Sequence, residues 1–393
     1  MTRQLARRTR HPLGGEIGGR ADHREAARAT ERQRDHIAFE PLAEAHSGIA
    51  ARSDDIDQRL VAVQLDTHPW IAAQVLSDQG SQHQLPRGAR RVDPQAPGRR
   101  AAGIAQCGER GVDLFDTADT YGAGDNERLL GGFVQAHRDQ LTLATKFGIV
   151  RKPDDYARTI DNSPEYVAHA CDASLARLGI DCIDLYYCHR RDPQVPIEDV
   201  IGAMARLVEA GKVRALGLSE VSAETLQRAH AVHPIAALQS EYSLWSREAE
   251  HELLALCAEL GSAFVAYSPL GRGFLTAKVT DTASLKADDF RRANPRFSDE
   301  ALARNRRLVE ALSEHATALG ATPGQLALAW LLERNDQVVP IPGTKRQRYL
   351  EENVAAEALR LDTATISALE ALFAPGSVIG ERYPSAGMTG IER

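Results

Sequence analysis

Short apolar runs alternate with longer, partly polar segments from about residue 104 to the end of the chain. Each apolar run ends in polar residues or glycine, which is typical of buried strands. The predicted strands are 112–118, 141–148, 182–190, 213–220, 235–243, 262–271 and 338–344. The segments between them carry helix signals, since several begin at Ser or Thr and several end at Gly.

The strands are continuously apolar rather than alternating, which favours a parallel sheet covered on both faces. An open doubly wound sheet would need a glycine-rich turn after its first strand, and "YGAGDNE" (121–127) has two glycines and follows a later strand. Seven strand–helix units instead predict an α/β fold, a (β/α)8 TIM barrel with one strand to be found. That first strand is doubtful and should fall before residue 104, where "LVAVQL" (60–65) is the one candidate.

The composition changes near residue 100. Residues 1–100 contain sixteen Arg and six of the thirteen His, but no Lys, Tyr or Asn. Such a segment is expected to be disordered, or to be a coding region read in an unintended frame, with a small regulatory module as the alternative. We therefore divide the chain into 1–103, a low-order Arg-rich segment, and 104–393, the barrel.

Charge and cysteine content exclude several classes of protein. The net charge of −7 argues against a nucleic-acid binder, which would present a basic surface. The five cysteines are irregularly spaced without a CxxC pair, which fits reduced cytoplasmic thiols better than a disulfide framework or a zinc site. No stretch approaches eighteen apolar residues, so no membrane span is expected. A cytoplasmic protein without a metal is the prediction, and its oligomeric state is open.

The ends of the predicted strands carry the candidate chemistry, because the carboxyl ends of barrel strands share one rim. The polar or small residues at this rim are Asp116, Tyr121, Lys146, His189, Ser219, Gln239, Tyr267, Ser268, Gly343, Thr344 and Lys345. Taken singly, each has an ordinary structural explanation, such as a helix cap or a packed ring. Their joint occurrence on one rim is what indicates a site.

A buried carboxylate at Asp116 needs a partner, and Lys146 ends the next strand. An ammonium beside the Tyr121 hydroxyl would favour phenolate and lower the pKa of that tyrosine from about 10. Such a tyrosine can donate a proton near neutral pH, while His189 holds the same substrate oxygen. An acid aimed at a carbonyl oxygen also needs a hydride, hence a nicotinamide cofactor.

Eight motifs in order resemble those of the aldo-keto reductase superfamily over roughly residues 104–384. They are "FDTADTYG", "ATKFG", "DLYYCHR", "GLSE", "LQSEYSLW", "AYSPLGRGFLT", "DDFRRANPRF" and "VPIPGTKRQRYLEENVAA". The tail "IGERYP" (379–384) further resembles longer-chain bacterial and plant members that reduce aldehydes. The resemblance implies an NADPH-dependent oxidoreductase that reduces an aldehyde or ketone to an alcohol.

The resemblance also implies roles for individual residues. The catalytic tetrad would be Asp116, Tyr121, Lys146 and His189, with Tyr121 as general acid. Around the nicotinamide, Tyr267 would stack on the ring while Ser219 and Gln239 hold its carboxamide. The residues implied for the rest of the cofactor are Ser268, Leu270 and Arg272 along the pyrophosphate, Gly343, Thr344, Lys345 and Arg348 at the 2′-phosphate, and Glu352 and Asn353 at the adenine.

Some positions depart from the family pattern. Glu220 stands where an Asn often follows the carboxamide Ser, and Tyr349 stands where a basic residue often precedes the adenine Asn. The family's opening strand has no clear counterpart. The alternatives to an active reductase are therefore a catalytically impaired cofactor-binding regulatory subunit and an inactive truncated reductase.

Overall fold

The computed structural model describes residues 63–64, 104, 107–150, 159–279, 281–287, 289–334 and 336–392. Residues 1–103, for which low order is predicted, lie outside the described residues, except for the two-residue strand at 63–64. The proposed boundary at 103/104 is therefore still a prediction.

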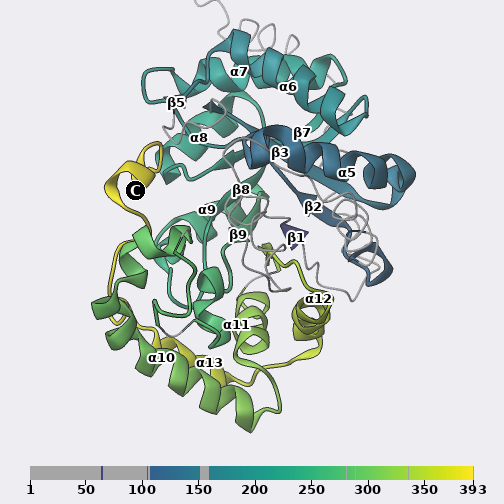
Figure 1. The fold of residues 1–393 in the computed structure, drawn as a ribbon. Coiled ribbons are helices and arrows are strands. Elements are labelled where there is room, and N and C mark those ends of the chain that lie inside the picture. The colour runs from purple at the N-terminus through teal and green to yellow at the C-terminus, as the bar shows by residue number, and fades with distance from the viewer. Residues whose placement is uncertain are drawn as a thin grey trace, which may run out of the picture. The chain divides into compact units, whose positions relative to one another are not determined.

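Eight parallel strands form one sheet at the centre of the described fold (Figure 1). In order across the sheet they are β1 (Val63–Gln64), β2 (Leu114–Asp116), β3 (Thr142–Phe147), β6 (Ile183–Cys188), β7 (Val213–Ser219), β8 (Ile235–Glu241), β9 (Ala263–Tyr267) and β10 (Val338–Ile341). All seven neighbouring pairs are parallel. Among the described residues no ladder joins β10 to β1, so the barrel is nearly closed.

All seven strands predicted beyond residue 104 are present, and the (β/α)8 barrel is confirmed. The uncertain first strand is β1, which lies within the "LVAVQL" segment and pairs Val63 with Phe115 and Gln64 with Asp116. A short antiparallel pair, β4 (Ile149–Val150) and β5 (Thr159–Ile160), stands apart from the main sheet.

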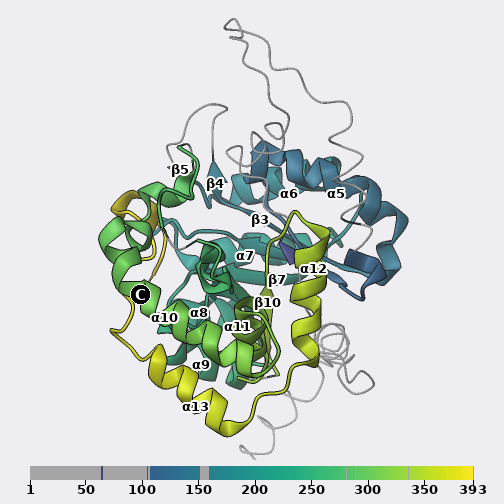
Figure 2. The same ribbon diagram turned by 60° about the horizontal axis from the view of Figure 1, so that its bottom comes forward.

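Helices cover the outside of the sheet. Those that follow successive strands are α5 (Asp125–Ala136), α6 (Pro164–Leu178), α7 (Ile197–Glu209), α8 (Ala223–Val232) and α9 (Leu253–Leu260). The remaining ones are α10 (Asp299–Ala318), α11 (Pro323–Leu332), α12 (Gln347–Val354) and α13 (Thr363–Leu372). Figure 2 shows α10, α11 and α13 together on one side of the barrel.

Local sequence explains where these helices begin. Ser163 and Ser222 precede α6 and α8, and each hydroxyl accepts a hydrogen bond from a backbone N–H of the first turn. Thr322 and Gln325 form a reciprocal capping box at the start of α11. These are the Ser and Thr signals that predicted the helices from the sequence.

The strands divide the apolar side chains between two faces. Outward-facing residues such as Leu216 and Leu238 join the large core between sheet and helices. Inward-facing residues form a smaller cluster inside the barrel, made of Leu114, Ala144, Leu185, Tyr187, Ala237, Val265, Tyr267 and Ile341. Small residues leave room here, since a Cβ on Gly217 would lie 2.4 Å from the Tyr187 ring. The bulky Tyr187 therefore fills the barrel opposite a glycine.

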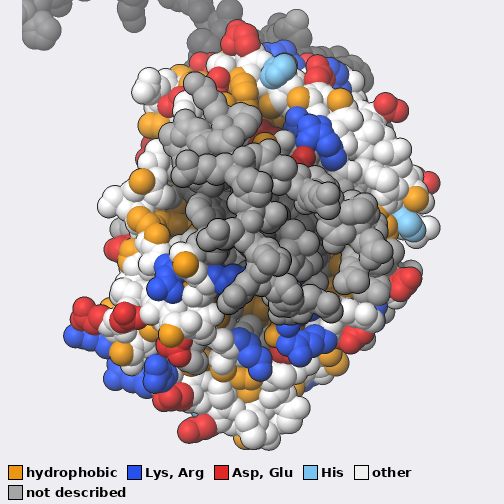
Figure 3. Space-filling view, viewed as in Figure 1, with side chains coloured by type: hydrophobic (Ala, Val, Ile, Leu, Met, Phe, Trp, Pro, Cys, Tyr) orange, Lys and Arg blue, Asp and Glu red, His pale blue; other side chains and the backbone are white. Residues whose placement is uncertain are grey.

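The surface seen in Figure 3 has Lys and Arg side chains interspersed with Asp and Glu, without a large region of one sign. Within the described part of the chain, no helix has both the length and the apolar character that a membrane crossing requires.

Candidate active site

Strand geometry brings the predicted site residues together at one end of the barrel. Side chains two positions apart on a strand face the same way. The inward face that carries Leu114, Ala144 and Leu185 therefore continues to Asp116, Lys146 and Tyr187. In the same way, Ala237 leads to Gln239 on β8, and Val265 leads to Tyr267 on β9.

Asp116 and Lys146 form a fully buried ion pair. Their side chains are 1% and 0% exposed, and the Lys146 ammonium donates to Oδ1 of Asp116 and to the Thr117 carbonyl oxygen at 2.9 Å. The second carboxylate oxygen accepts from Nε2 of Gln239 at 2.8 Å. Burial lowers the pKa of Lys146, while the Asp116 carboxylate acts in the opposite direction. Partners from two other strands, β3 and β8, thus satisfy both oxygens of the carboxylate, which offsets the cost of burying it.

Tyr121 lies above this pair. It begins a 3-10 turn, Tyr121–Gly124, that follows β2. The Lys146 ammonium nitrogen is 5.2 Å from the centre of the Tyr121 ring, and the His189 ring meets it edge-on at a centroid distance of 6.0 Å. Three neighbouring strands therefore place an amine, a phenol and an imidazole around one point.

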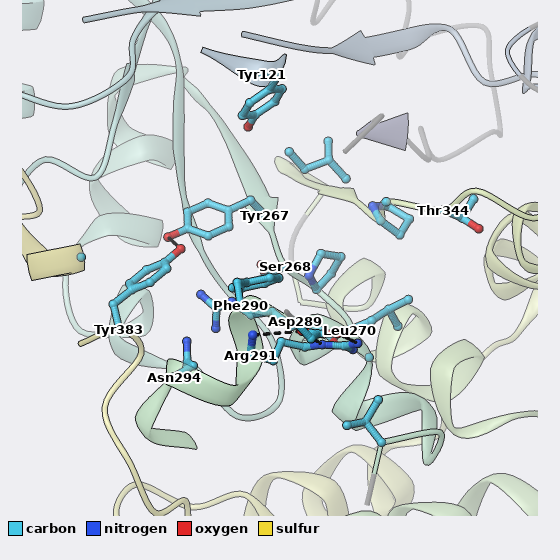
Figure 4. A pocket seen from close by; sticks show the side chains of 18 of the residues that line it. Tyr121, Tyr267, Ser268, Leu270, Asp289, Phe290, Arg291, Asn294, Thr344 and Tyr383 are labelled. Carbon is cyan, nitrogen blue, oxygen red and sulfur yellow. Dashed lines mark hydrogen bonds and ion pairs between the residues drawn. The ribbon is translucent and has the colours of Figure 1, made fainter. Parts of the chain in front are cut away.

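A cavity of about 1010 Å³ opens beside this group and extends along the rim. Of the predicted residues, those that line it are Tyr121, His189, Ser219, Gln239, Tyr267, Ser268, Leu270, Arg272, Gly343, Thr344, Lys345, Glu352 and Asn353. Asp116 and Lys146 do not line it. Figure 4 shows the Tyr121 hydroxyl directed into this space, with Tyr267 below it.

Arg348 does not line the cavity. Its guanidinium instead donates to the Tyr349 hydroxyl at 2.8 Å and lies over that ring. Arg346, which precedes α12, lines the cavity together with Tyr349. The role predicted for Arg348 is therefore still untested. Arg346, the basic residue that lines the cavity, was not predicted from the sequence.

The carboxyl-terminal tail forms part of the cavity wall. The Tyr383 hydroxyl lies 3.2 Å from that of Tyr267 (Figure 4). The Arg272 guanidinium lies over the Tyr383 ring. Asn294 fixes the tail by donating to the Arg382 carbonyl oxygen at 2.6 Å. Tyr383 lies in the motif "IGERYP", and its contact with Tyr267 was not predicted from that motif.

Buried charges support this wall from behind. The Glu241 carboxylate receives Arg272 at 2.8 Å and Arg296 at 3.3 Å, and Arg382 lies 3.3 Å from Glu220. The arginines hold the pKa of Glu241 below its usual value despite burial. Glu220 also accepts from the Ser240 hydroxyl at 2.9 Å. The residue that departs from the family pattern therefore anchors the tail.

Arg190 is a further cavity residue that the sequence analysis did not single out. It is 6% exposed, and its Nη1 donates to the His189 carbonyl oxygen at 2.7 Å and to the Ser219 hydroxyl at 3.1 Å. Burial acts to lower the pKa of Arg190, but nearby Tyr267 and Glu220 more than offset it, so that pKa is raised. Arg190 is a permanently charged group at the same end of the cavity as Tyr121.

No group of three or more His, Cys, Asp or Glu side chains suited to a metal ion occurs among the described residues. The polar groups that line the cavity are hydroxyls, amides, cations and the carboxylates of Asp289 and Glu352. This set is suited to a polar organic ligand.

Comparisons with known proteins show the family to which the chain belongs. Residues 88–374 match the sequence model of the Aldo/keto reductase family. The chain is 43% identical over 296 residues to "Aldo-keto reductase yakc [NADP(+)]" of Schizosaccharomyces pombe, covering 74% of this chain and 87% of that protein. It is 46% identical over 282 residues to "Probable aldo-keto reductase 1" of Glycine max, covering 70% and 79%.

Solved structures show the same fold. The glycerol dehydrogenase AKR11B4 of Gluconobacter oxydans superimposes with a TM-score of 0.69 at 25% identity, covering 81% of this chain and 93% of that one. An aldo/keto reductase of Klebsiella pneumoniae in complex with NADP and acetate gives 0.58 at 25% identity, covering 74% and 90%. The chain therefore belongs to the aldo/keto reductase family of oxidoreductases.

Proposed function

We propose that this protein reduces an aldehyde or ketone to the alcohol, with NADPH as the hydride donor and Tyr121 as the general acid. The observation that carries the proposal is the cluster of Asp116, Lys146, Tyr121 and His189 at the end of a large cavity. When bound, NADPH supplies a hydride to the carbonyl carbon. The carbonyl oxygen then needs a proton, and the Tyr121 hydroxyl is the acid directed into the cavity.

The other three residues support that proton transfer. The Lys146 ammonium lies 5.2 Å from the Tyr121 ring, where its charge favours loss of the phenolic proton. Asp116 holds Lys146 in place and is itself held by Gln239. His189 meets the Tyr121 ring edge-on, where its imidazole can hold the carbonyl oxygen toward the hydroxyl. Proton and hydride together convert C=O to CH–OH.

The shape and charge of the cavity support NADPH as the cofactor. Its volume accommodates a dinucleotide next to a small substrate. Lys345 and Arg346, which follow β10, both line the cavity, and two cations there suit the additional 2′-phosphate of NADPH. The relative from S. pombe carries NADP(+) in its name. The five free cysteines support action in the cytoplasm, where thiols stay reduced.

A test that separates binding from chemistry is Tyr121→Phe. NADPH binding, followed by quenching of protein fluorescence, should be unchanged, because only a hydroxyl facing the substrate is lost. The rate of NADPH oxidation with a panel of simple aldehydes should fall about 10²- to 10⁴-fold, the usual contribution of a general acid. Tyr166→Phe is the matched control, since Tyr166 lies on α6 outside the cavity and should keep full activity. Equal turnover by Tyr121→Phe and the parent would refute the proposal.

A further inference from the structure

Arg190 presents a cation to the cavity with part of its hydrogen-bonding capacity unused. Its guanidinium is buried next to His189, and Nη1 makes both of its hydrogen bonds. Nε is buried without a hydrogen-bond partner in the described part of the chain. None of the hydrogen bonds between described residues uses Nη2 either. A buried guanidinium left in this condition costs several kcal/mol unless a ligand completes it.

The carboxylates near this end of the cavity are already engaged. Glu241 is shared by Arg272 and Arg296, and Glu220 pairs with Arg382. Arg296 also lies 3.9 Å from the more exposed Glu248, so these three arginines have carboxylate partners. Arg190 differs, because no carboxylate among the described residues forms an ion pair with it. Its charge is open to an anion that enters the cavity.

We propose that Arg190 selects substrates that carry a carboxylate close to the reacting carbonyl group. This inference rests on the proposed function, because it concerns the substrate of the same site. Arg190 directly follows His189 and binds Ser219, so its free nitrogens lie at the reacting end of the cavity. The planar guanidinium can take both oxygens of a carboxylate at once. A carboxylate only a few bonds from the carbonyl would reach it.

The test compares an acid with its neutral ester. We choose 2-formylbenzoate and its methyl ester, which share the aldehyde and differ in charge. In Arg190→Met, kcat/KM for the acid should fall about 10- to 100-fold, as expected when a hydrogen-bonded charge pair is lost. The fall should appear mainly in KM, because the carboxylate is held alike before and during the reaction. The ester should be reduced at nearly the parent rate.

Two further variants sharpen the comparison. Arg190→Lys keeps the charge but loses the planar fork, so its activity with the acid should fall between parent and Met variant. Arg206→Met removes an exposed arginine on α7 and should leave both substrates unaffected. NADPH binding, measured by fluorescence, should be the same in all four proteins and shows that each is folded.

A binding measurement keeps the inference separate from the reaction. Benzoate is titrated calorimetrically into parent and Arg190→Met, and its affinity should fall about 10- to 100-fold in the variant. If the parent oxidises no NADPH with either compound, the proposed function fails, while the benzoate titration still decides the role of Arg190. Equal losses with acid and ester, together with weaker NADPH binding, would assign the guanidinium to the cofactor and overturn the inference. Unchanged acid activity and benzoate affinity would overturn it as well.

Discussion

Asp119 is a half-buried acid three residues beyond Asp116, in the loop that follows β2. Its Oδ1 has no hydrogen-bond partner in the described part of the chain, although its backbone N–H donates to the Lys146 carbonyl oxygen at 3.1 Å. Burial, with the nearby Glu127 carboxylate adding to it, raises the pKa of Asp119 to about 8. In the unfolded chain the pKa of this carboxyl returns to about 3.9. Folding therefore opposes the ionisation of Asp119.

The sign of the pH effect follows from these two pKa values. Between about pH 4 and pH 8 the unfolded chain loses this proton and the folded protein retains it, so the contribution of Asp119 to stability falls as pH rises. Asp119→Asn cannot ionise and should be more stable than the parent at pH 8, by more than about 1 kcal/mol, with little difference near pH 4. Urea unfolding at both values measures this. A constant difference between the two proteins across that range would show that Asp119 is ionised in the folded state.

At the residue scale, the site side chains at the ends of strands could be predicted from the sequence. Contacts made by segments distant along the chain could not. Lys146 and His189 were predictable because each ends a strong apolar run. Arg190 was missed because a basic residue after a His has many ordinary explanations, and only burial without a carboxylate sets it apart. Tyr383 was missed because its contact with Tyr267 joins residues 116 positions apart.

At the scale of elements, α5 and α6 meet at a glycine. A Cβ on Gly131 would lie 2.8 Å from the Leu178 carbonyl oxygen and 3.2 Å from that of Arg177. Both atoms belong to the backbone of α6, so they cannot turn aside as a side chain would. This close approach positions the two helices that follow β2 and β3, the strands that carry Asp116 and Lys146.

The neighbouring glycine provides a matched control. Gly131→Ala should lower the free energy of unfolding by about 1–3 kcal/mol, because the added methyl group forces the helices apart. Gly132 is exposed, and a Cβ there would meet nothing within 4 Å. Gly132→Ala should therefore raise stability by up to about 1 kcal/mol through helix propensity alone. Urea unfolding checks both, and a gain in stability from Gly131→Ala would contradict the close helix contact.

Elements were predicted more reliably than the residues between them. The apolar runs and the Ser, Thr and Gly caps marked strands and helices because these signals are local. The cavity end near α12 was less predictable, since Arg346 faces the cavity and Arg348 lies on Tyr349. Only Gln347 separates them, and the start of α12 at that residue decides which arginine faces the cavity.

At the scale of the whole molecule, seven strands of strong pattern and one short strand produce the nearly closed barrel. Val63–Gln64 completes the order of strands next to β2, the strand that ends in Asp116. The sequence indicated this segment only by elimination, because a long run of atypical composition separates it from β2. Parallel pairing of distant segments leaves no local signal.

The barrel places an acid, a charged amine and an imidazole at one end of a cavity, and this arrangement has one direct chemical consequence. Under the proposed function, a bound NADPH would supply the hydride for the carbonyl carbon and Tyr121 would protonate the oxygen. Benzaldehyde incubated with the protein and NADPH deuterated at C4 should give benzyl alcohol with one deuterium on the alcohol carbon, detected by mass spectrometry. Both C4-labelled diastereomers are tested, and one of them should transfer its label. Binding of NADPH without any deuterated alcohol from either diastereomer would contradict the account.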